Sequence, residues 1–161
     1  MVSIRSARRA DEAALRALDL ATWTAEVSPP APSDPTDSFF NDATLPADVL
    51  VADQGGTVVG YVRLSQQGPL GSHDHVLMIN GLAVAPDHQG AGLGRALVQA
   101  ALDRAQSRAA RKVSLRVLAP NVRARSVYEA CGFVVEGVLR GEFLLQGKFV
   151  DDVFMAHHLE K

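Results

Sequence analysis

The amino-acid sequence predicts a single domain of the mixed α/β class (α+β mixed), in which helices cover the faces of a central mixed β-sheet. The length of 161 residues suits one domain over residues 1–161, large enough to bury a core of its own. Apolar residues make up 47% and charged residues 21%, as in ordinary globular proteins. Strand-like apolar runs alternate with helical segments, which gives the order β-α-loop-β-β-β-α-β-α-β-β.

The N-terminal part of the chain predicts a short strand, a helix and a long loop. Residues 3–7 are extended, and apolar side chains recur at helical spacing over residues 10–23. Five prolines in residues 27–47 forbid a long regular element. Phe39 and Phe40 are apolar, so we expect part of this segment to pack down as a helical turn.

The middle of the chain predicts three strands. Residues 49–64 read as a hairpin around a Gly-Gly turn. Residues 66–75 form a loop rich in Gly, Pro, Ser and His. Residues 76–84 form a nearly continuous apolar run, typical of a strand that is covered on both faces, and Pro86 ends it.

The C-terminal half predicts two helices and three strands. Residues 94–108 carry apolar side chains at helical spacing, and residues 113–117 alternate as a strand does. A short helix is expected over residues 121–131, since an asparagine can cap its start and a glycine follows its end. Residues 133–145 and 149–158 form a closing hairpin.

Glycines recur at positions 90, 92 and 94, between a predicted buried strand and a predicted helix. Such a turn directs main-chain N–H groups toward one point, and the helix start adds the positive end of its dipole, so we predict an anion site for phosphate. The Gly-Lys-Ser/Thr of a Walker A loop is missing, and Arg95 stands where a dinucleotide-binding turn needs its third glycine. The alternative is a tight connection that binds nothing.

Gln89, Gly92 and Gly94 match the Gln/Arg-x-x-Gly-x-Gly/Ala hallmark of the GCN5-related N-acetyltransferase (GNAT) family, which this sequence resembles. A second signature of that family follows as Asn121-x-x-Ala124-x-x-x-Tyr128-x-x-x-Gly132-Phe133. The resemblance covers about residues 76–155, and the closing hairpin looks like that of the branch acetylating free amino acids or ribosomal-protein N-termini. The resemblance implies about seven strands flanked by about four helices, in the order β-α-α-β-β-β-α-β-α-β-β.

The resemblance also implies that acetyl-coenzyme A binds as a co-substrate. No metal is expected, because His157 and His158 have no Cys or carboxylate pattern that would make a zinc site. Main-chain N–H groups of the glycine turn would bind the pyrophosphate, and residues 82–84 would pair with the pantetheine arm as an added strand does. The residues expected to bind the coenzyme are Leu82, Ala83, Val84, Gln89, Gly90, Ala91, Gly92, Leu93, Gly94, Arg95, Asn121, Ser126 and Tyr128.

The implied chemistry is direct attack of an amine on the thioester within a ternary complex. Tyr128 is the expected acid for the leaving thiolate, because phenol and thiol pKa values lie within roughly two units of each other. Asn80 and Gly81 stand where the family has a β-bulge, which would free a main-chain N–H near Leu82 to stabilise the oxyanion. Close helix–sheet packing is the alternative reason for Gly81.

The general base is left open by the sequence. The strand at 76–84 carries no carboxylate, which leaves His73, His75 or a chain of water molecules. Cys131 has no nucleophile signature around it and reads as a small buried residue.

The expected acceptor is a primary amine of an amino-acid-like small molecule or of a peptide N-terminus, with Arg140 a candidate partner for an acceptor carboxylate. A net charge of −2 argues against nucleic acid as a partner, and no apolar run reaches the ~20 residues of a membrane span. One cysteine and a start without signal-peptide features predict a cytoplasmic protein, and exposed hairpin edges allow a homodimer. The alternative function is a non-catalytic module or sensor that binds acyl-coenzyme A.

Overall fold

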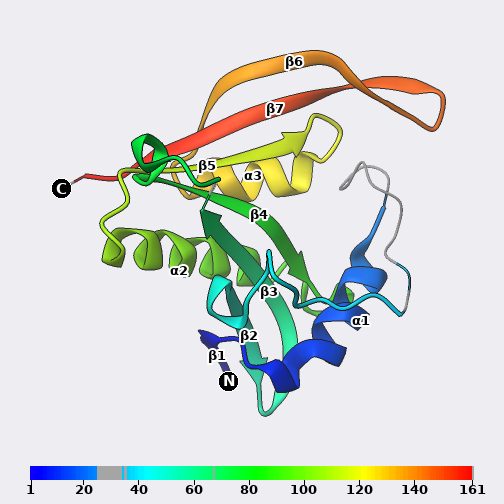
Figure 1. Cartoon of the computed structure of the whole chain (residues 1–161). Helices are drawn as coiled ribbons and strands as arrows, with labels where there is room; N and C mark the ends of the chain where they lie inside the picture. The colour runs from blue at the N-terminus through cyan, green and yellow to red at the C-terminus, as the bar shows by residue number, and fades with distance from the viewer. Residues whose placement is uncertain (25–33, 35, 67, 161) are drawn as a thin grey trace.

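The computed structural model describes residues 1–24, 34, 36–66 and 68–160, and its framework is one seven-stranded sheet (Figure 1). The strands are β1 (Val2–Ser6), β2 (Val49–Gln54), β3 (Thr57–Gln66), β4 (Val76–Val84), β5 (Lys112–Leu118), β6 (Val134–Leu145) and β7 (Lys148–His158). The helices are α1 (Glu12–Thr22), α2 (Leu93–Ser107) and α3 (Val122–Ala130), with 3-10 turns at Arg9–Asp11, Pro46–Asp48, Gly71–His73 and Pro86–His88.

The sheet is mixed, as predicted, and its strand order is β1-β2-β3-β4-β5-β7-β6. Every neighbouring pair is antiparallel except β4 and β5, which run parallel because α2 connects them across one face of the sheet. The sequence prediction of seven strands is confirmed. Strand β4 spans the residues expected of it, and α2 begins one residue earlier than expected.

The helix count is lower than the family resemblance implied. The described residues contain three α-helices rather than about four. The fourth was expected in the proline-rich segment, where residues 25–33 and 35 lie outside the described part, and residues 36–48 contain only the 3-10 turn at Pro46–Asp48. The proline that opens this turn fixes φ and removes a backbone donor, so it starts a turn well but does not extend one.

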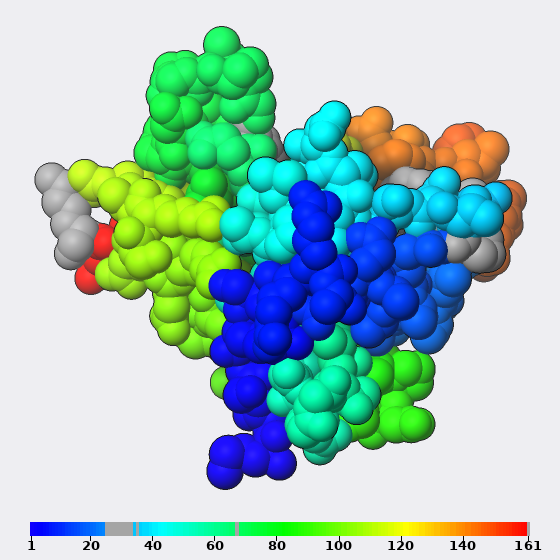
Figure 2. Space-filling model, turned by 60° about the horizontal axis from the view of Figure 1, so that its bottom comes forward, coloured from blue at the N-terminus to red at the C-terminus, as the bar shows by residue number. Residues whose placement is uncertain are grey.

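The two faces of the sheet are covered by different helices. Along β2, Val49 and Val51 pack in a cluster with Leu15 of α1, whereas Leu50 packs with Leu97 of α2 in a larger cluster. This alternation follows from the period of two in a strand. Both faces of the sheet are therefore apolar. Strand β4 also contributes to both clusters, Leu77 and Ile79 to the larger one and Ala83 to the other, as expected for a strand that is covered on both faces. Figure 2 shows the blue N-terminal residues in the middle of one side of the molecule, between lime-coloured α2 and the orange hairpin.

The proline-rich segment packs partly against the α1 face, as predicted. Phe40 is 4% exposed, and Phe39 meets the Tyr61 ring edge-to-face at a centroid distance of 5.3 Å. The Glu12 carboxylate accepts from the main-chain N–H groups of Phe39 and Phe40 at 2.7 and 3.2 Å, which ties this segment to α1. Among the described helices none has the length and apolar character to cross a bilayer.

Candidate active site

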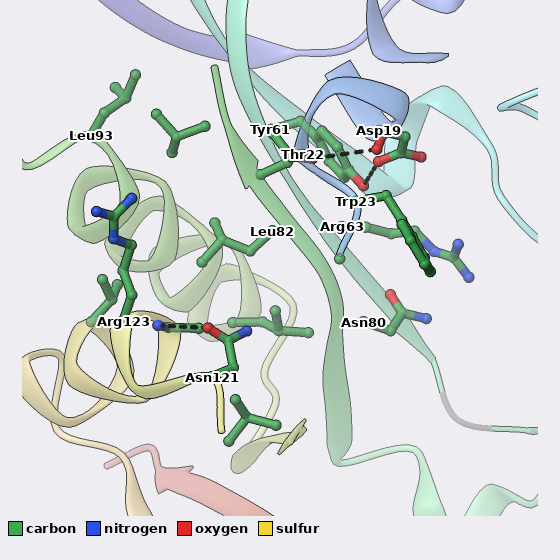
Figure 3. A pocket seen from close by; sticks show the side chains of 18 of the residues that line it. Asp19, Thr22, Trp23, Tyr61, Arg63, Asn80, Leu82, Leu93, Asn121 and Arg123 are labelled. Atoms are coloured by element: carbon green, nitrogen blue, oxygen red, sulfur yellow. Dashed lines mark hydrogen bonds between the residues drawn. The ribbon is translucent and has the colours of Figure 1, made fainter. Parts of the chain in front are cut away.

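Strands β4 and β5 separate halfway along their length. They pair over four residues, from Val76 opposite Lys112 to Ile79 opposite Leu115, and then diverge. The register between β3 and β4 shifts at this same point. Arg63 pairs with Gly81 and Leu64 pairs with Ile79, which leaves Asn80 as the extra residue of a β-bulge. The bulge predicted at Asn80 and Gly81 is confirmed. A cleft of 1010 Å³ opens here and is lined by residues of β3, β4, α1, α2 and α3 (Figure 3).

The glycine turn forms one end of the cleft. Gly90 and Gly92 have φ angles of +84° and +81°, a conformation that residues with a Cβ rarely adopt. After Gln89, whose N–H bonds to the Pro86 carbonyl at 3.4 Å, the next N–H that bonds back is that of Ala96 in α2, to the Gly92 carbonyl at 3.1 Å. In the described part of the chain, the six main-chain N–H groups from Gly90 to Arg95 have no acceptor. A row of unsatisfied donors at a helix start suits a diphosphate.

Side chains brace this turn from two directions. The Gln89 amide donates to the Val84 carbonyl at 3.0 Å, which joins the turn to the end of β4. Arg123 of α3 donates to the Gln89 side-chain oxygen, which joins the turn to the far wall of the cleft. The side chain of the motif glutamine, Gln89, therefore forms hydrogen bonds within the protein that hold the turn in place. Sequence reasoning missed Arg123, because nothing local indicates a partner 34 residues away.

Helix α3 supplies the opposite wall. The Asn121 side chain accepts from the Ala124 N–H at 3.3 Å and caps the helix, which confirms its predicted capping role. Tyr128 is 6% exposed and its ring packs beside Phe133, while it still contributes to the lining of the cleft. The described residues offer the Tyr128 hydroxyl no hydrogen bond. Burial raises the pKa of this phenol, which keeps it protonated at neutral pH.

A polar group that sequence reasoning missed, formed by Asp19, Tyr61 and Arg63, lies on the side of β4 opposite Leu82 and Asn121. The Tyr61 hydroxyl of β3 donates to the Asp19 carboxylate of α1 at 2.5 Å, and Arg63 lines the same part of the cleft. In Figure 3, Asp19, Trp23, Arg63 and Asn80 lie on one side of β4, with Leu82, Asn121 and Arg123 on the other. Burial raises the pKa of Asp19, against the lowering effects of Tyr61 and Arg63.

Most of the residues predicted to bind coenzyme or to act in catalysis meet in this one cleft. Its lining includes Asn80, Leu82, Ala83, Val84, Gln89, Gly90, Gly92, Leu93, Gly94, Arg95, Asn121 and Tyr128. Ala91 and Ser126 are outside the lining, and both are solvent-exposed. Gly81 also lines the cleft, and a Cβ added to it would meet the Tyr61 ring of the neighbouring strand β3 rather than a helix.

The candidate bases suggested by the sequence do not reach the cleft. His73 and His75 lie in and after the Gly71–His73 turn, before the start of β4, with ring centroids 6.5 Å apart, and neither contributes to the lining. Arg140 is likewise outside it. Cys131 is half-buried, and burial raises the pKa of its thiol, which fits a structural residue rather than a nucleophile. The described residues include no cluster of three His, Cys, Asp or Glu side chains suited to a metal.

Comparison with known proteins agrees with this architecture. Residues 13–133 match the profile of the "Acetyltransferase (GNAT) family". The chain is 28% identical over 168 residues to "L-amino acid N-acyltransferase MnaT" of Escherichia coli (strain K12), covering 99% of this chain and 95% of that protein. It superposes with a TM-score of 0.83 on smu.2055 from Streptococcus mutans UA159, at 29% identity over 99% of both chains.

A third similar protein was solved with its ligand. The protein yncA from Salmonella typhimurium, in a structure described as holding its cofactor acetyl-CoA, superposes with a TM-score of 0.79. The superposition covers 100% of this chain and 95% of that one, at 23% identity. The overall fold is therefore shared along nearly the whole length of the chain.

Proposed function

This chain belongs to the acetyltransferase (GNAT) family and is an acetyl-coenzyme A-dependent N-acetyltransferase, and on that premise we propose that it acetylates the primary amine of an amino-acid-like molecule or a peptide N-terminus. The amine attacks the thioester directly, in a ternary complex. The observation that carries the proposal is the cleft where β4 leaves β5, with unsatisfied amides at one end and charged side chains at the other.

The donor half of the cleft suits a coenzyme with a diphosphate and an amide-bearing arm. The N–H groups of residues 90–95 would bind the diphosphate, and Gly90 and Gly92 leave open space where a Cβ would stand. Beyond Ile79, β4 has no strand partner on its β5 side, so residues 82–84 would pair with the arm as β-strand addition requires. When bound, acetyl-coenzyme A supplies an acetyl group activated as a thioester.

Two groups of the chain would stabilise the charges that develop. A main-chain N–H near Leu82, just past the bulge, would donate to the oxyanion, and one such donor is worth about 3–4 kcal/mol in other acyl-transfer enzymes. Tyr128 would protonate the leaving sulfur. Its hydroxyl is protonated at neutral pH and has no competing acceptor among the described residues, which supports this role.

The proposal extends to location and assembly. A cytoplasmic protein agrees with the single cysteine, since the chain cannot form an internal disulfide. A homodimer would cover β6, an edge strand whose large apolar side chains face solvent, among them Val134, Val138 and Leu144.

Replacing Tyr128 by Phe tests the proposal. Release of free thiol from acetyl-coenzyme A would be followed against a panel of L-amino acids, dipeptides and amines. We expect kcat to fall by about 10²–10⁴-fold, because the acid is lost. Coenzyme affinity by calorimetry stays the same, and stability changes by no more than about 0.5 kcal/mol, because no protein hydrogen bond is removed.

The same assay separates the enzyme from a binding module. Wild-type protein that binds coenzyme A but acetylates no member of the panel would favour the sensor. Equal turnover by the wild type and by Tyr128→Phe would remove Tyr128 from the mechanism.

A further inference from the structure

Several charged side chains line the α1 side of the cleft, among them Arg16, Asp34 and Asp37, and two of opposite sign, Asp19 and Arg63, have roles that the fold does not explain. Asp19 comes from α1 and Arg63 from β3, and both line the cleft on the side of β4 away from Leu82 and Asn121 (Figure 3). Arg63 is near enough for its charge to lower the pKa of Asp19. The two do not approach within the 4.0 Å of an ion pair, and neither forms an ion pair with another described residue.

Asp19 is held by one of its two carboxylate oxygens. Oδ1 accepts the 2.5 Å hydrogen bond from the Tyr61 hydroxyl, and Tyr61 is itself 6% exposed. Within the described part of the chain, Oδ2 has no hydrogen-bond partner. A half-buried carboxylate with one oxygen fixed and the other open is positioned to accept a proton or to bind an ammonium group. Burial raises its pKa, which strengthens it as a base.

Arg63 has a buried hydrogen-bond donor without an acceptor in the described part of the chain. Its Nε is buried and has no hydrogen-bond partner among the described residues. A buried donor without a partner lowers the stability of the fold, typically by about 1–3 kcal/mol, so such a group usually binds a ligand or a water molecule. The partner that a guanidinium binds best is a carboxylate or a phosphate.

The β4 bulge lies beside the base of the Arg63 side chain and beside Tyr61, whose hydroxyl binds Asp19. A Cβ built on Gly81 would lie 3.2 Å from Cε2 of Tyr61 and 3.4 Å from Cβ of Arg63, so these side chains press against the backbone at that point. Under the proposed function, the bulge is where the acetyl carbonyl would meet the main-chain N–H near Leu82. An acceptor held between Asp19 and Arg63 would therefore stand beside the group to be transferred.

We propose that Asp19 binds the acceptor's ammonium group and removes its proton, while Arg63 binds a carboxylate of the same molecule, so that the acceptor is a free α-amino acid. This inference rests on the proposed function and narrows it. Tyr61 is a positioning residue, because it holds the Asp19 carboxylate. A polyamine fits less well, since Arg63 would repel a second cation, and a peptide N-terminus lacks the adjacent carboxylate.

The transfer balances in protons and electrons. The ammonium nitrogen gives one proton to Asp19, and its lone pair then forms the C–N bond to the acetyl carbon. The electrons of the C–S bond leave with sulfur, which takes the Tyr128 proton. The nitrogen loses its second surplus proton through water to Tyr128, and Asp19 returns its own proton to solvent. The sum is one N-acetyl amino acid, one free thiol and one proton.

Three sets of matched compounds test the acceptor assignment. Thiol release would be measured for L-amino acids, for their α-amides and for the amines that lack the carboxyl group. We expect the wild type to favour amino acids over both other sets by at least about tenfold in kcat/KM, since a buried charge left unpaired penalises the wrong substrate. The variant Arg63→Gln should lose this preference. A wild type that prefers amides or amines would overturn the carboxylate assignment.

Asp19→Asn tests the base, with Asp103→Asn on the exposed face of α2 as the matched control. We expect kcat/KM for amino acids to fall by about 100-fold or more in Asp19→Asn, and the acidic limb of its pH profile to move to higher pH, because the amine must then lose its proton without help. Binding of coenzyme A should stay unchanged in calorimetry, and the affinity of its complex for the amino acid should drop. Asp103→Asn should match the wild type.

The possible outcomes distinguish a failure of the role proposed for Asp19 from a failure of the N-acetyltransferase function. An active wild type whose rate and pH profile survive Asp19→Asn would overturn the inference and leave the N-acetyltransferase intact. A wild type that binds coenzyme A and acetylates nothing in the three sets would overturn the proposed function and this inference together. A loss of melting temperature in Asp19→Asn with an unaltered pH profile would assign Asp19 a structural role and overturn its role as base.

Discussion

Replacing Gly92 by Ala isolates the backbone geometry of the anion-binding turn. Gly92 has φ +81° and precedes α2, and a Cβ built on it would meet no atom within 4 Å. Steric overlap therefore contributes nothing, and the cost is that of placing alanine in the left-handed region, about 1 kcal/mol. For a domain of this size, that lowers the melting temperature by about 2–4 °C.

Gly94→Ala is the matched control two residues later. Gly94 lies inside α2 with an ordinary negative φ, and its added Cβ would sit 3.7 Å from the Val127 methyl groups, a normal contact distance. Alanine restricts the unfolded chain more than glycine does, so this variant should gain about 0.4–1 kcal/mol of stability. The two substitutions add the same methyl group and should shift stability in opposite directions.

Thermal and urea unfolding would measure the stabilities, and calorimetry with coenzyme A would measure affinity. In Gly92→Ala we expect affinity to fall by up to about fivefold, the equivalent of 1 kcal/mol, if the turn relaxes to relieve the strain and turns its amides away. A Gly92→Ala protein as stable as the wild type would refute the left-handed turn. Unaltered coenzyme affinity in a destabilised Gly92→Ala protein would refute the link between turn geometry and anion binding.

Two further predictions concern the β4 bulge and the N-terminal ion pair. Gly81→Ala should destabilise the fold by about 1–3 kcal/mol in urea unfolding, because the new Cβ would lie 3.2 Å from the Tyr61 ring, and a normal stability would contradict the tight contact. The pKa of Asp11 is lowered, chiefly by its hydrogen bond from Arg5, so the stability that this carboxylate contributes is present above its unfolded pKa of 3.8 and is lost as pH falls through its lower folded value. Unfolding of Asp11→Asn against the wild type should show a difference that is largest near neutral pH and shrinks below pH 3.8; a constant difference would contradict the pairing.

Local features of the sequence were enough for the strands, for the three helices and for the turn that opens α2. Residues 89–95 are enough to predict the geometry of the glycine turn. Its positive φ angles and the unpaired N–H groups at the start of α2 depend only on residues a few positions apart. Asn121 caps α3 through an atom three residues away. The bulge at Asn80 followed from a glycine within an apolar strand.

Pairings over long sequence distances could not be predicted in this way. Tyr61 and Asp19 are 42 residues apart, and Arg123 meets Gln89 across 34, so no periodicity indicates either contact. The search for a base on β4 and in the loop before it led to His73 and His75, whereas the Asp19 carboxylate that lines the cleft comes from α1.

The sequence by itself determined which elements form and that a turn with exposed amides opens α2, since both depend on local backbone preference and on apolar periodicity. Only the tertiary structure decided which charged side chains line the cleft beside α1. That choice depends on how α1 crosses the sheet and on where β4 parts from β5, and both are set by packing between segments distant in the chain.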